Sequence, residues 1–383
     1  MNSKKDLFQL PDDLHYFNCA YMSPLLKSVE DAGIRGIQRK RNPAEIKPAD
    51  FFSETVAVKN KFAQLIHGSA SQVAIIPSVA YGLKSAVMNI PTNNGNHAIT
   101  IFDEFPSDYY TIADWCRENK KELKIIKAPD SMENRGQQWT DKLLESIHRD
   151  TSAVVMTAIH WTDGTRFDLK KIGQRCKEMN VLFIVDGTQS VGALPMDVSE
   201  FQIDALICTG YKWLLGPYSI GLAYYSEFFN NGRPPENSWM NKLNAEDFTK
   251  LTNYVEDYKP GAARFNVGES SNFILVPMLS RALDQIHEWE PSAIQHYCRD
   301  LIQPLLKFLR ENNYWVEDDD HRASHLFGFL LPPTVHREKL LQDLELNKII
   351  VSVRGDAIRV SPHVYNTPED IESLINVLQK NER

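Results

Sequence analysis

The sequence predicts an α/β fold, in which a large domain built on a mainly parallel seven-stranded sheet is joined to a smaller α+β domain. Short β-branched runs alternate with helical stretches through the middle of the chain, as in a doubly wound sheet. Several of these runs are continuously apolar, for example residues 181–185, which is typical of strands buried on both faces of a parallel sheet. The pattern changes after about residue 225, which indicates a second structural unit.

The expected elements of the large domain follow this alternation. We expect strands at residues 73–76, 98–102, 124–127, 153–159, 181–185, 205–209 and 221–225. We expect helices between them at residues 81–88, 109–119, 140–148 and 169–179. In such sheets ligands bind outside the carboxyl ends of the strands, so the residues directly after each strand are the first candidates for a site.

The remaining elements belong to the second unit. A loop at residues 230–235 is followed by helices at 276–288 and 293–312, short strands near 326–331 and 349–353, and a last helix that begins at Pro368 after a capping Thr367. We therefore divide the chain into an N-terminal arm (1–20), a large domain (21–258) and a small domain (259–383), with residues 265–272 crossing between the two domains.

Composition and charge exclude several classes of protein. The chain has 383 residues, is 43% hydrophobic and carries a formal net charge of −8, which gives no basic face for nucleic acid. No run approaches the roughly 18 apolar residues of a membrane span, and the first residues contain no apolar stretch of signal-peptide length. The cysteines are scattered, odd in number and form no CxxC motif, so we expect no metal site, no disulfide framework and a cytoplasmic location. They are Cys19, Cys116, Cys176, Cys208 and Cys298.

Two neighbouring strands end in residues that carry chemistry. Asp186 closes the apolar run 181–185, where an acid is well placed to meet a ligand. Lys212 follows the next predicted strand and lies between Tyr211 and Trp213 in an apolar context. A desolvated lysine has a lowered pKa and becomes a nucleophile toward a carbonyl group.

These two segments together resemble a known family. The pairing of Asp186-x-x-Gln189 with the segment 209–217 (Thr-Gly-Tyr-Lys-x-x-x-Gly-Pro) is similar to the class V aminotransferase group of fold-type I enzymes that use pyridoxal 5'-phosphate (PLP). This group includes cysteine desulfurases, kynureninases and isopenicillin-N-epimerase-like proteins. The resemblance extends from about Tyr16 to the final helix.

The resemblance implies roles for the residues at the centre of the site. Lys212 would hold PLP as a Schiff base and then move the α-proton of the substrate. Asp186 would pair with the pyridinium nitrogen, which keeps the ring able to accept electrons. Gln189 would donate to the phenolate oxygen of the ring, at a position where kynureninases carry histidine.

The phosphate group of the cofactor is expected at the first strand–loop–helix unit. Backbone N–H groups of Val79 and Ala80 at the start of a helix would form an anion site. Ser78 could add its hydroxyl group or could instead cap the helix. Thr209 and Tyr211 would add hydroxyl groups from the lysine loop.

Further residues would contact the ring and the substrate. Phe105 resembles the residue that stacks on the cofactor ring in kynureninase-like proteins, although a core position is an alternative. His160 and Asp163 follow another strand and are candidates for contact with the substrate. Arg359 matches the arginine that clamps the substrate carboxylate, with Arg354 as the alternative.

The segment around Gly268 matches the stretch that reaches the phosphate site of the neighbouring subunit in relatives. Gly268 and Ser270 would contact that phosphate, whereas the carboxylate of Glu269 would repel it; Trp239 is a further candidate. A shared active site implies a homodimer.

The reaction remains open at this point. We expect an aminotransferase that acts on a small amino acid and a 2-oxo acid, with a lyase or an epimerase as the alternative and a non-catalytic scaffold as the least favoured possibility. Cysteine desulfurases need a nucleophilic cysteine on a loop shortly before the arginine that matches Arg359. Residues 346–358 contain none, which disfavours that reaction.

Overall fold

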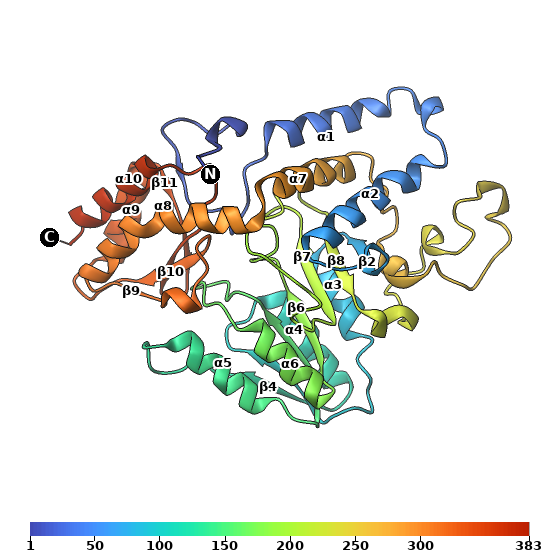
Figure 1. Cartoon of the computed structure of the whole chain (residues 1–383), viewed down its shortest axis with the longest axis horizontal. Helices are drawn as coiled ribbons and strands as arrows, with labels where there is room; N and C mark the ends of the chain where they lie inside the picture. Colours follow the sequence, from blue (N-terminus) through green and yellow to red (C-terminus); the bar gives the residue numbers. More distant parts are fainter. Residues whose placement is uncertain (383) are drawn as a thin grey trace.

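A seven-stranded sheet forms the centre of the protein in the computed structural model, which describes residues 1–382 (Figure 1). Its strand order is β2-β8-β7-β6-β5-β3-β4, and every neighbouring pair is parallel except the two pairs that include β8. The predicted fold class is therefore confirmed. The strands are β2 (Val73–Ile76), β3 (His97–Ile101), β4 (Glu122–Ile126), β5 (Thr151–Thr157), β6 (Leu182–Asp186), β7 (Ala205–Thr209) and β8 (Gly221–Tyr225).

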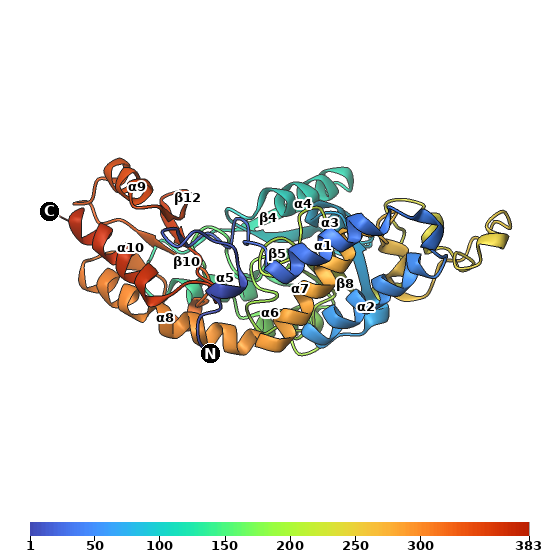
Figure 2. The ribbon, with the colours of Figure 1, turned by 90° about the horizontal axis from the view of Figure 1, so that it is seen from above.

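Helices cover both faces of this sheet, because alternate residues of each buried strand point to opposite faces. Ala153 and Val155 pack in the core that contains α3 (Val79–Val87) and α4 (Pro106–Glu118). Val154 and Met156 pack in the larger core on the other face. That core receives α2 (Asp50–Leu65), α5 (Arg135–Ser146), α6 (Leu169–Met179) and α7 (Leu275–Trp289), and α1 (Lys27–Arg39) packs on α7. Figure 2 shows α3 and α4 on one side of the sheet and α6 and α7 on the other.

The smaller unit has its own antiparallel sheet in the order β12-β13-β10-β9 and its own hydrophobic core. These strands are β9 (Trp315–Val316), β10 (Phe327–Leu330), β12 (Ser352–Arg354) and β13 (Ala357–Val360). The helices are α8 (Pro291–Glu311), α9 (Arg337–Leu346) and α10 (Pro368–Lys380). The expected boundary at residues 258 and 259 lies before α7, whose buried side chains pack in the core of the large sheet.

The N-terminal arm lies against the small domain. β1 (His15–Tyr16) pairs in parallel with β11 (Ile349–Ile350), and the Ser352 hydroxyl donates to the Asn18 side chain across 334 residues of sequence. The arm then runs toward the lysine loop, where the Ser23 backbone N–H donates to the Tyr211 carbonyl at 3.0 Å. The two ends of the sequence therefore meet beside the predicted site.

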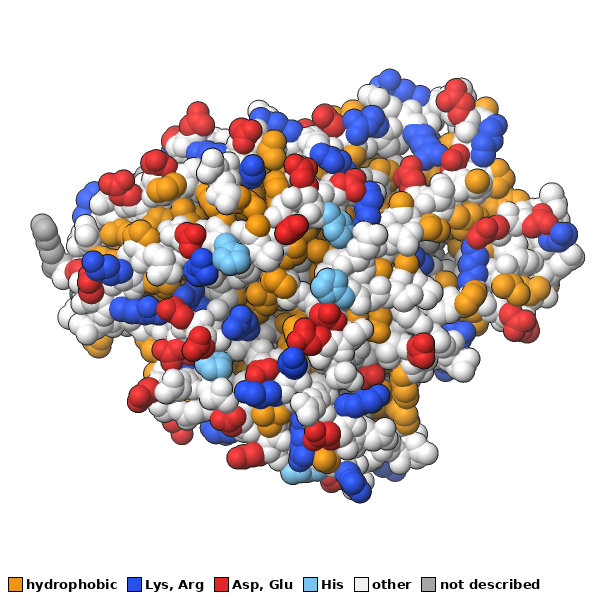
Figure 3. All heavy atoms as spheres, in the orientation of Figure 1, with side chains coloured by type: hydrophobic (Ala, Val, Ile, Leu, Met, Phe, Trp, Pro, Cys, Tyr) orange, Lys and Arg blue, Asp and Glu red, His pale blue; other side chains and the backbone are white. Residues whose placement is uncertain are grey.

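The distribution of charged side chains on the surface agrees with the absence of a basic face expected from the sequence. Acidic and basic side chains are interspersed over the face drawn in Figure 3, with no large patch of one sign. No helix within residues 1–382 is both long and apolar enough to span a bilayer.

Candidate active site

A cavity of about 330 Å³ opens at the carboxyl ends of β5, β6 and β7. This is the edge at which parallel sheets of this kind bind ligands. Its walls come from the ends of the strands, from the loop before α3 and from two aromatic side chains. The lining includes Pro77, Ser78, Val79, Ala80, Phe105, Ser107, Thr157, Trp161, Asp186, Thr188, Gln189, Thr209, Tyr211, Lys212, Tyr218 and Ser219.

Lys212 extends into this cavity from the loop after β7. Its side chain is almost fully buried, with the residue only 7% exposed, and the Nζ atom lies 5.6 Å from the centre of the Phe105 ring. Burial is the largest cause that lowers the pKa of Lys212, to about 8, and the positive charges of Arg359 and Arg354 act in the same direction. The amine is thus available in its neutral form close to physiological pH.

Three buried carboxyl groups lie close enough to influence one another, and we call Glu104, Asp108 and Asp186 the acid cluster; Asp186 is the one that lines the cavity. Asp186 ends β6, and its Oδ1 accepts a hydrogen bond from the Thr188 backbone N–H at 2.8 Å. Burial raises the pKa of Asp186, although Thr188 and Lys212 oppose that shift. Asp186 therefore stands where the resemblance places the partner of the pyridinium nitrogen.

Asp108, in the first turn of α4, is 0% exposed, and neither of its carboxyl oxygens has a hydrogen-bond partner among residues 1–382. Burial and then the charges of Asp186 and Glu104 raise the pKa of Asp108 far above its usual range. Burial also raises the pKa of Glu104, to about 7, while its oxygens accept from the backbone N–H groups of Phe105 and Thr157, both at 2.8 Å. Of the three acids only Asp186 lines the cavity, so its carboxyl group is the one placed to meet a protonated heterocyclic ring.

The sequence analysis assigned no role to Glu104 or Asp108. The sequence did contain a signal for these two acids, because they lie on either side of Phe105 just after a predicted strand, where ligands bind. Acids that turn out to be buried at such a place are rare without a role. Only the fold shows that this loop brings them beside Asp186, which lies about 80 residues further along the chain.

Gln189 lines the cavity with its amide orientation fixed. Its Oε1 accepts a hydrogen bond from Trp213 Nε1 at 2.9 Å, and its Nε2 donates to the Ala20 carbonyl at 3.1 Å. A primary amide has two N–H donors, so one donor of Gln189 is left for a ligand. This arrangement fits the role of donor to a phenolate oxygen.

The structure brings together the residues that we expected to bind the phosphate group of the cofactor. Ser78, Val79, Ala80, Thr209 and Tyr211 all line the cavity. The Ser78 hydroxyl also accepts from the Tyr81 backbone N–H at 3.2 Å and so caps α3. The free N–H groups at the start of α3 suit an anion such as phosphate.

Phe105 and Trp161 form an aromatic wall. Their rings meet edge to face, with centroids 5.6 Å apart, and both line the cavity. Trp161 Nε1 donates to the Asp103 carbonyl at 2.7 Å, which joins the loops that carry the two rings. Phe105 thus has the position expected of a stacking residue rather than of a residue inside the core.

Arg359 comes from β13 of the small domain and is 1% exposed. It is behind Trp161 rather than in the described lining of the cavity: its Nη1 donates to the Trp161 carbonyl at 2.7 Å, and its buried Nε has no partner among residues 1–382. Burial, followed by the charge of Arg354, lowers the pKa of Arg359 to about 9. Arg354 lies over the Trp161 ring at 5.8 Å.

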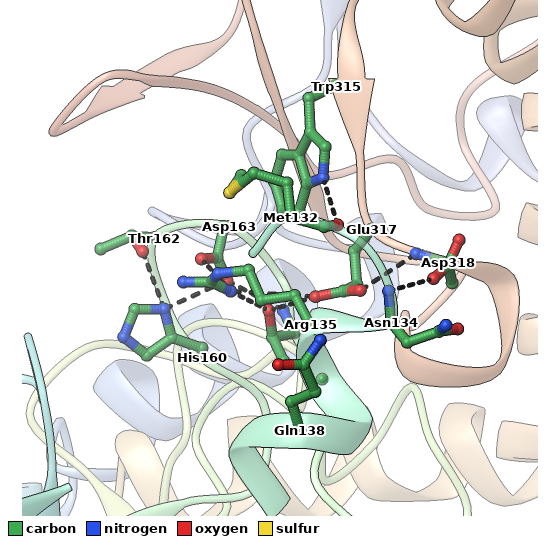
Figure 4. A network of polar contacts seen from close by, with 12 residues as sticks. Met132, Asn134, Arg135, Gln138, His160, Thr162, Asp163, Trp315, Glu317 and Asp318 are labelled. Carbon is green, nitrogen blue, oxygen red and sulfur yellow. Dashed lines mark hydrogen bonds and ion pairs between the residues drawn. The ribbon is translucent and has the colours of Figure 1, made fainter. Parts of the chain in front are cut away.

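The structure does not bring His160 and Asp163 to the cavity. Both are buried and belong to a network that joins the large domain to the small one (Figure 4). Arg135 Nη1 lies 3.0 Å from Asp163 and donates to the Thr165 hydroxyl at 2.8 Å, and that hydroxyl donates to Glu317 of the small domain at 3.0 Å. We call Arg135, His160, Asp163 and Glu317 the joint.

Gly268 and Ser270 also lie apart from the cavity within one chain. The Gly268 backbone N–H donates to the Glu236 carboxylate. Trp239 and Glu269 line a separate hollow together with Ile37 and Phe51. Their expected contact with a neighbouring subunit remains a prediction.

Comparison with known proteins agrees with this geometry. The family model for aminotransferase class V matches residues 48–374. The chain belongs to the class V aminotransferase family. PLP is its cofactor, as membership of this family indicates.

Similar proteins carry different activities. An uncharacterized aminotransferase of Bacillus subtilis is 25% identical over 84% of this chain and 82% of its own length. A probable cysteine desulfurase of Mycoplasma genitalium is 26% identical over 78% and 72%. The solved cystine C–S lyase C-DES has a TM-score of 0.84 at 18% identity, covering 97% and 99% of the two chains.

These comparisons correct one expectation. The missing loop cysteine disfavoured desulfurase chemistry, yet relatives named as cysteine desulfurases and a similar desulfurase fold bring it back as a candidate. The absence of a cysteine in residues 346–358 excludes attack on the substrate sulfur by a thiolate from that loop. It does not exclude other reactions that cleave a carbon–sulfur bond.

Proposed function

We propose that this protein is a PLP-dependent aminotransferase that moves the amino group of a small amino acid to a 2-oxo acid. The observation that carries the proposal is the buried Lys212 amine, which lines one cavity together with Asp186 of the acid cluster. The curated aminotransferase relative, similar over 84% of the chain, supports this choice among the reactions of the family.

The residues of this chain divide the work. When bound, PLP supplies an electron sink for the negative charge that develops at the substrate Cα. Lys212, with its lowered pKa, would take the proton from the substrate Cα and, as its conjugate acid, would deliver a proton to complete the amino-group transfer. Asp186 holds a proton on the ring nitrogen, and Gln189 donates to the ring oxygen.

Other residues orient the substrate. The guanidinium group of Arg359 holds the carboxylate, since its Nε has no hydrogen-bond partner among residues 1–382. Phe105 and Trp161 cover the reacting atoms and keep water away. Each of these roles follows from a side chain at the cavity or directly behind it.

Cleavage of a carbon–sulfur bond is the second candidate, because similar proteins are named as cysteine desulfurases and as a cystine C–S lyase. All five cysteines of this chain are free and buried. Burial raises the pKa of each of these thiols, Cys19 to about 12 for example. The form of this reaction that needs no protein thiolate, elimination by Lys212, is therefore the one that suits this chain.

A homodimer and a cytoplasmic location complete the proposal. Ile37 and Trp239 are exposed apolar side chains beside the hollow that also contains Glu269, which supports a partner subunit at this face. The five free cysteines support a reducing compartment. Sedimentation of the purified protein tests the dimer.

Absorption spectroscopy tests the reaction. We expect a visible band in the purified protein that borohydride removes and that the Lys212→Ala variant lacks. Lys59→Ala is the matched control, because burial also lowers the pKa of Lys59 to about 8, yet Lys59 does not line the cavity.

A panel of amino acids then separates the candidates. Transamination converts the band with an amino acid, and a 2-oxo acid restores it. Release of pyruvate or alanine without that cycle means a lyase instead. A protein that shows no band even after addition of PLP contradicts the proposal.

A further inference from the structure

The two ring nitrogens of His160 both face hydrogen-bond acceptors. The residue is 2% exposed, its Nδ1 lies 3.1 Å from Asp163 Oδ1 and its Nε2 lies 3.2 Å from the Phe102 carbonyl oxygen. A neutral imidazole has one N–H donor and one lone pair, so one of these oxygens would face a lone pair. The doubly protonated ring satisfies both.

A second buried histidine shows the opposite arrangement. His325 is 0% exposed; its Nε2 donates to the Gln189 carbonyl at 2.8 Å, and its Nδ1 accepts from Gln295 Nε2 at 2.6 Å. The orientation of that amide is fixed, because Gln295 Oε1 accepts from the Ser324 backbone N–H. One donor and one acceptor require a neutral ring, and burial lowers the pKa of His325 to about 4.

The charges around His160 agree with its geometry. Burial opposes protonation, and Arg135 also repels the charged ring, but the charge and hydrogen bond of Asp163 and the charge of Glu104 outweigh them and raise the pKa of His160. The Trp139 ring, 5.0 Å away, covers one side. The Thr162 hydroxyl, whose Oγ1 lies 2.8 Å from Nδ1, is a neutral group that could donate to a ring without a proton on Nδ1.

The two bonds of His160 join the loops that form the aromatic wall. Phe102 directly follows β3 and leads to Phe105 three residues later, while Asp163 lies two residues after Trp161. The joint continues from Asp163 through Arg135 to Glu317 of the small domain (Figure 4). The same ring therefore links both loops to the domain that carries Arg359.

We propose that His160 is a positioning residue that stays protonated at neutral pH and holds Phe105 and Trp161 over the cofactor by donating from both ring nitrogens. The positioning half of this inference rests on the proposed function, since it assigns Phe105 and Trp161 to the cofactor site. The charge of His160 does not rest on it.

Nuclear magnetic resonance of the full-length holoenzyme labelled with ¹⁵N in histidine tests the charge. We expect two protonated ring nitrogens for His160 from pH 6 to pH 8, and one protonated nitrogen for His325 over the same range. The His160→Gln and His325→Gln variants assign the signals. A neutral His160 ring at pH 7, with Thr162 donating to Nδ1, overturns the inference.

A second experiment tests the positioning role. Glutamine can keep only one of the two contacts, so we expect His160→Gln to lose much of the visible circular dichroism of bound PLP. Its KM for the amino acid should rise roughly tenfold with a smaller change in kcat, because one hydrogen bond to a charged group is lost. His325→Gln is the matched control and should leave KM nearly unchanged.

The outcomes separate the two proposals. Unchanged dichroism and KM in a folded His160→Gln variant contradict the positioning role even if the ring is charged. If that variant does not fold, Asp163→Asn replaces it, and we expect its dichroism to fall as the pH rises, because His160 then loses its proton in the accessible range. A wild-type protein without a cofactor band counts against the proposed function, whereas the charge of His160 still decides this inference.

Discussion

Two groups of buried charges lie close together in this protein and are built in opposite ways. The acid cluster gathers three carboxyl groups, and Asp108 has no hydrogen-bond partner among residues 1–382. In the joint, acids alternate with the cations Arg135 and His160, so that charges of opposite sign are neighbours. The first group needs a ligand to be compensated, and the second is already compensated within the protein.

This difference separates a binding site from a structural connection. Burial raises the pKa values of Glu104, Asp108 and Asp186, and the charge of Asp186 adds to that shift for the other two acids, which is typical of a functional site. In the joint, His160 and Arg135 hold the pKa of Asp163 below its usual range despite burial. Buried carboxyl groups therefore indicate a binding site in the acid cluster and a rigid connection between the domains in the joint.

Among the substitutions that test this comparison, removal of the Arg135 cation should change the free energy of unfolding most. We expect Arg135→Met to destabilise the protein by about 3–5 kcal/mol, because Asp163 and Glu317 then remain buried without their partner. Unfolding in urea followed by circular dichroism measures the change. Arg117→Met is the control, since Arg117 pairs with Asp114 at the surface and should cost less than about 1 kcal/mol. Equal effects of the two variants would contradict the contrast.

Neutralising an unpartnered acid should act in the opposite direction. We expect Asp108→Asn to stabilise the apoprotein by about 1–3 kcal/mol at pH 8, because a buried charge is removed. The folded pKa of Asp108 is raised, so its unfavourable contribution grows as the pH rises above the unfolded value and vanishes toward acid. The gain should therefore shrink when the melting temperatures are compared at pH 5. Asp114→Asn, on the exposed side of the same helix, should show no such pH dependence.

A milder change in the joint should have the smallest effect. Glu317→Gln keeps an oxygen that can accept from the Thr165 hydroxyl, and Arg135 keeps Asp163 at 3.0 Å, so we expect a loss of about 1 kcal/mol. The same urea experiment measures it, with the exposed Glu311→Gln as control. A loss as large as that of Arg135→Met would mean that Glu317, rather than Asp163, is the main partner of Arg135.

Much of the large domain could be predicted because its signals are local. Apolar runs such as residues 181–185 identify buried strands, and the predicted helix at 169–179 matches α6. The small domain was harder: the expected strand at 349–353 is two short strands, β11 and β12, and β13 was not predicted. Strands of two to four residues carry too few positions for a periodic pattern.

The candidate site divides in the same way. Asp186 and Lys212 could be found because they lie at the carboxyl ends of two neighbouring strands, and Gln189 because its motif resembles that of a known family. His160 follows a strand as well, yet its ring faces Phe102 and Asp163 rather than the cavity. The direction in which a side chain points after a strand depends on the loop and its long-range partners, and those contacts leave no local pattern.

The pairing of β1 with β11 has a consequence for the order in which the protein is made. Residues 15–20 are synthesised more than 300 residues before their strand partner β11 and before Ser361, whose hydroxyl accepts from the Ala20 backbone N–H. At roughly 5–20 residues per second, the arm waits many seconds before it can dock. Since the Ala20 carbonyl fixes the amide of Gln189, the pocket around Lys212 is completed only after residues 349–361 have been synthesised. Loading of the cofactor is therefore a late step in the maturation of the chain.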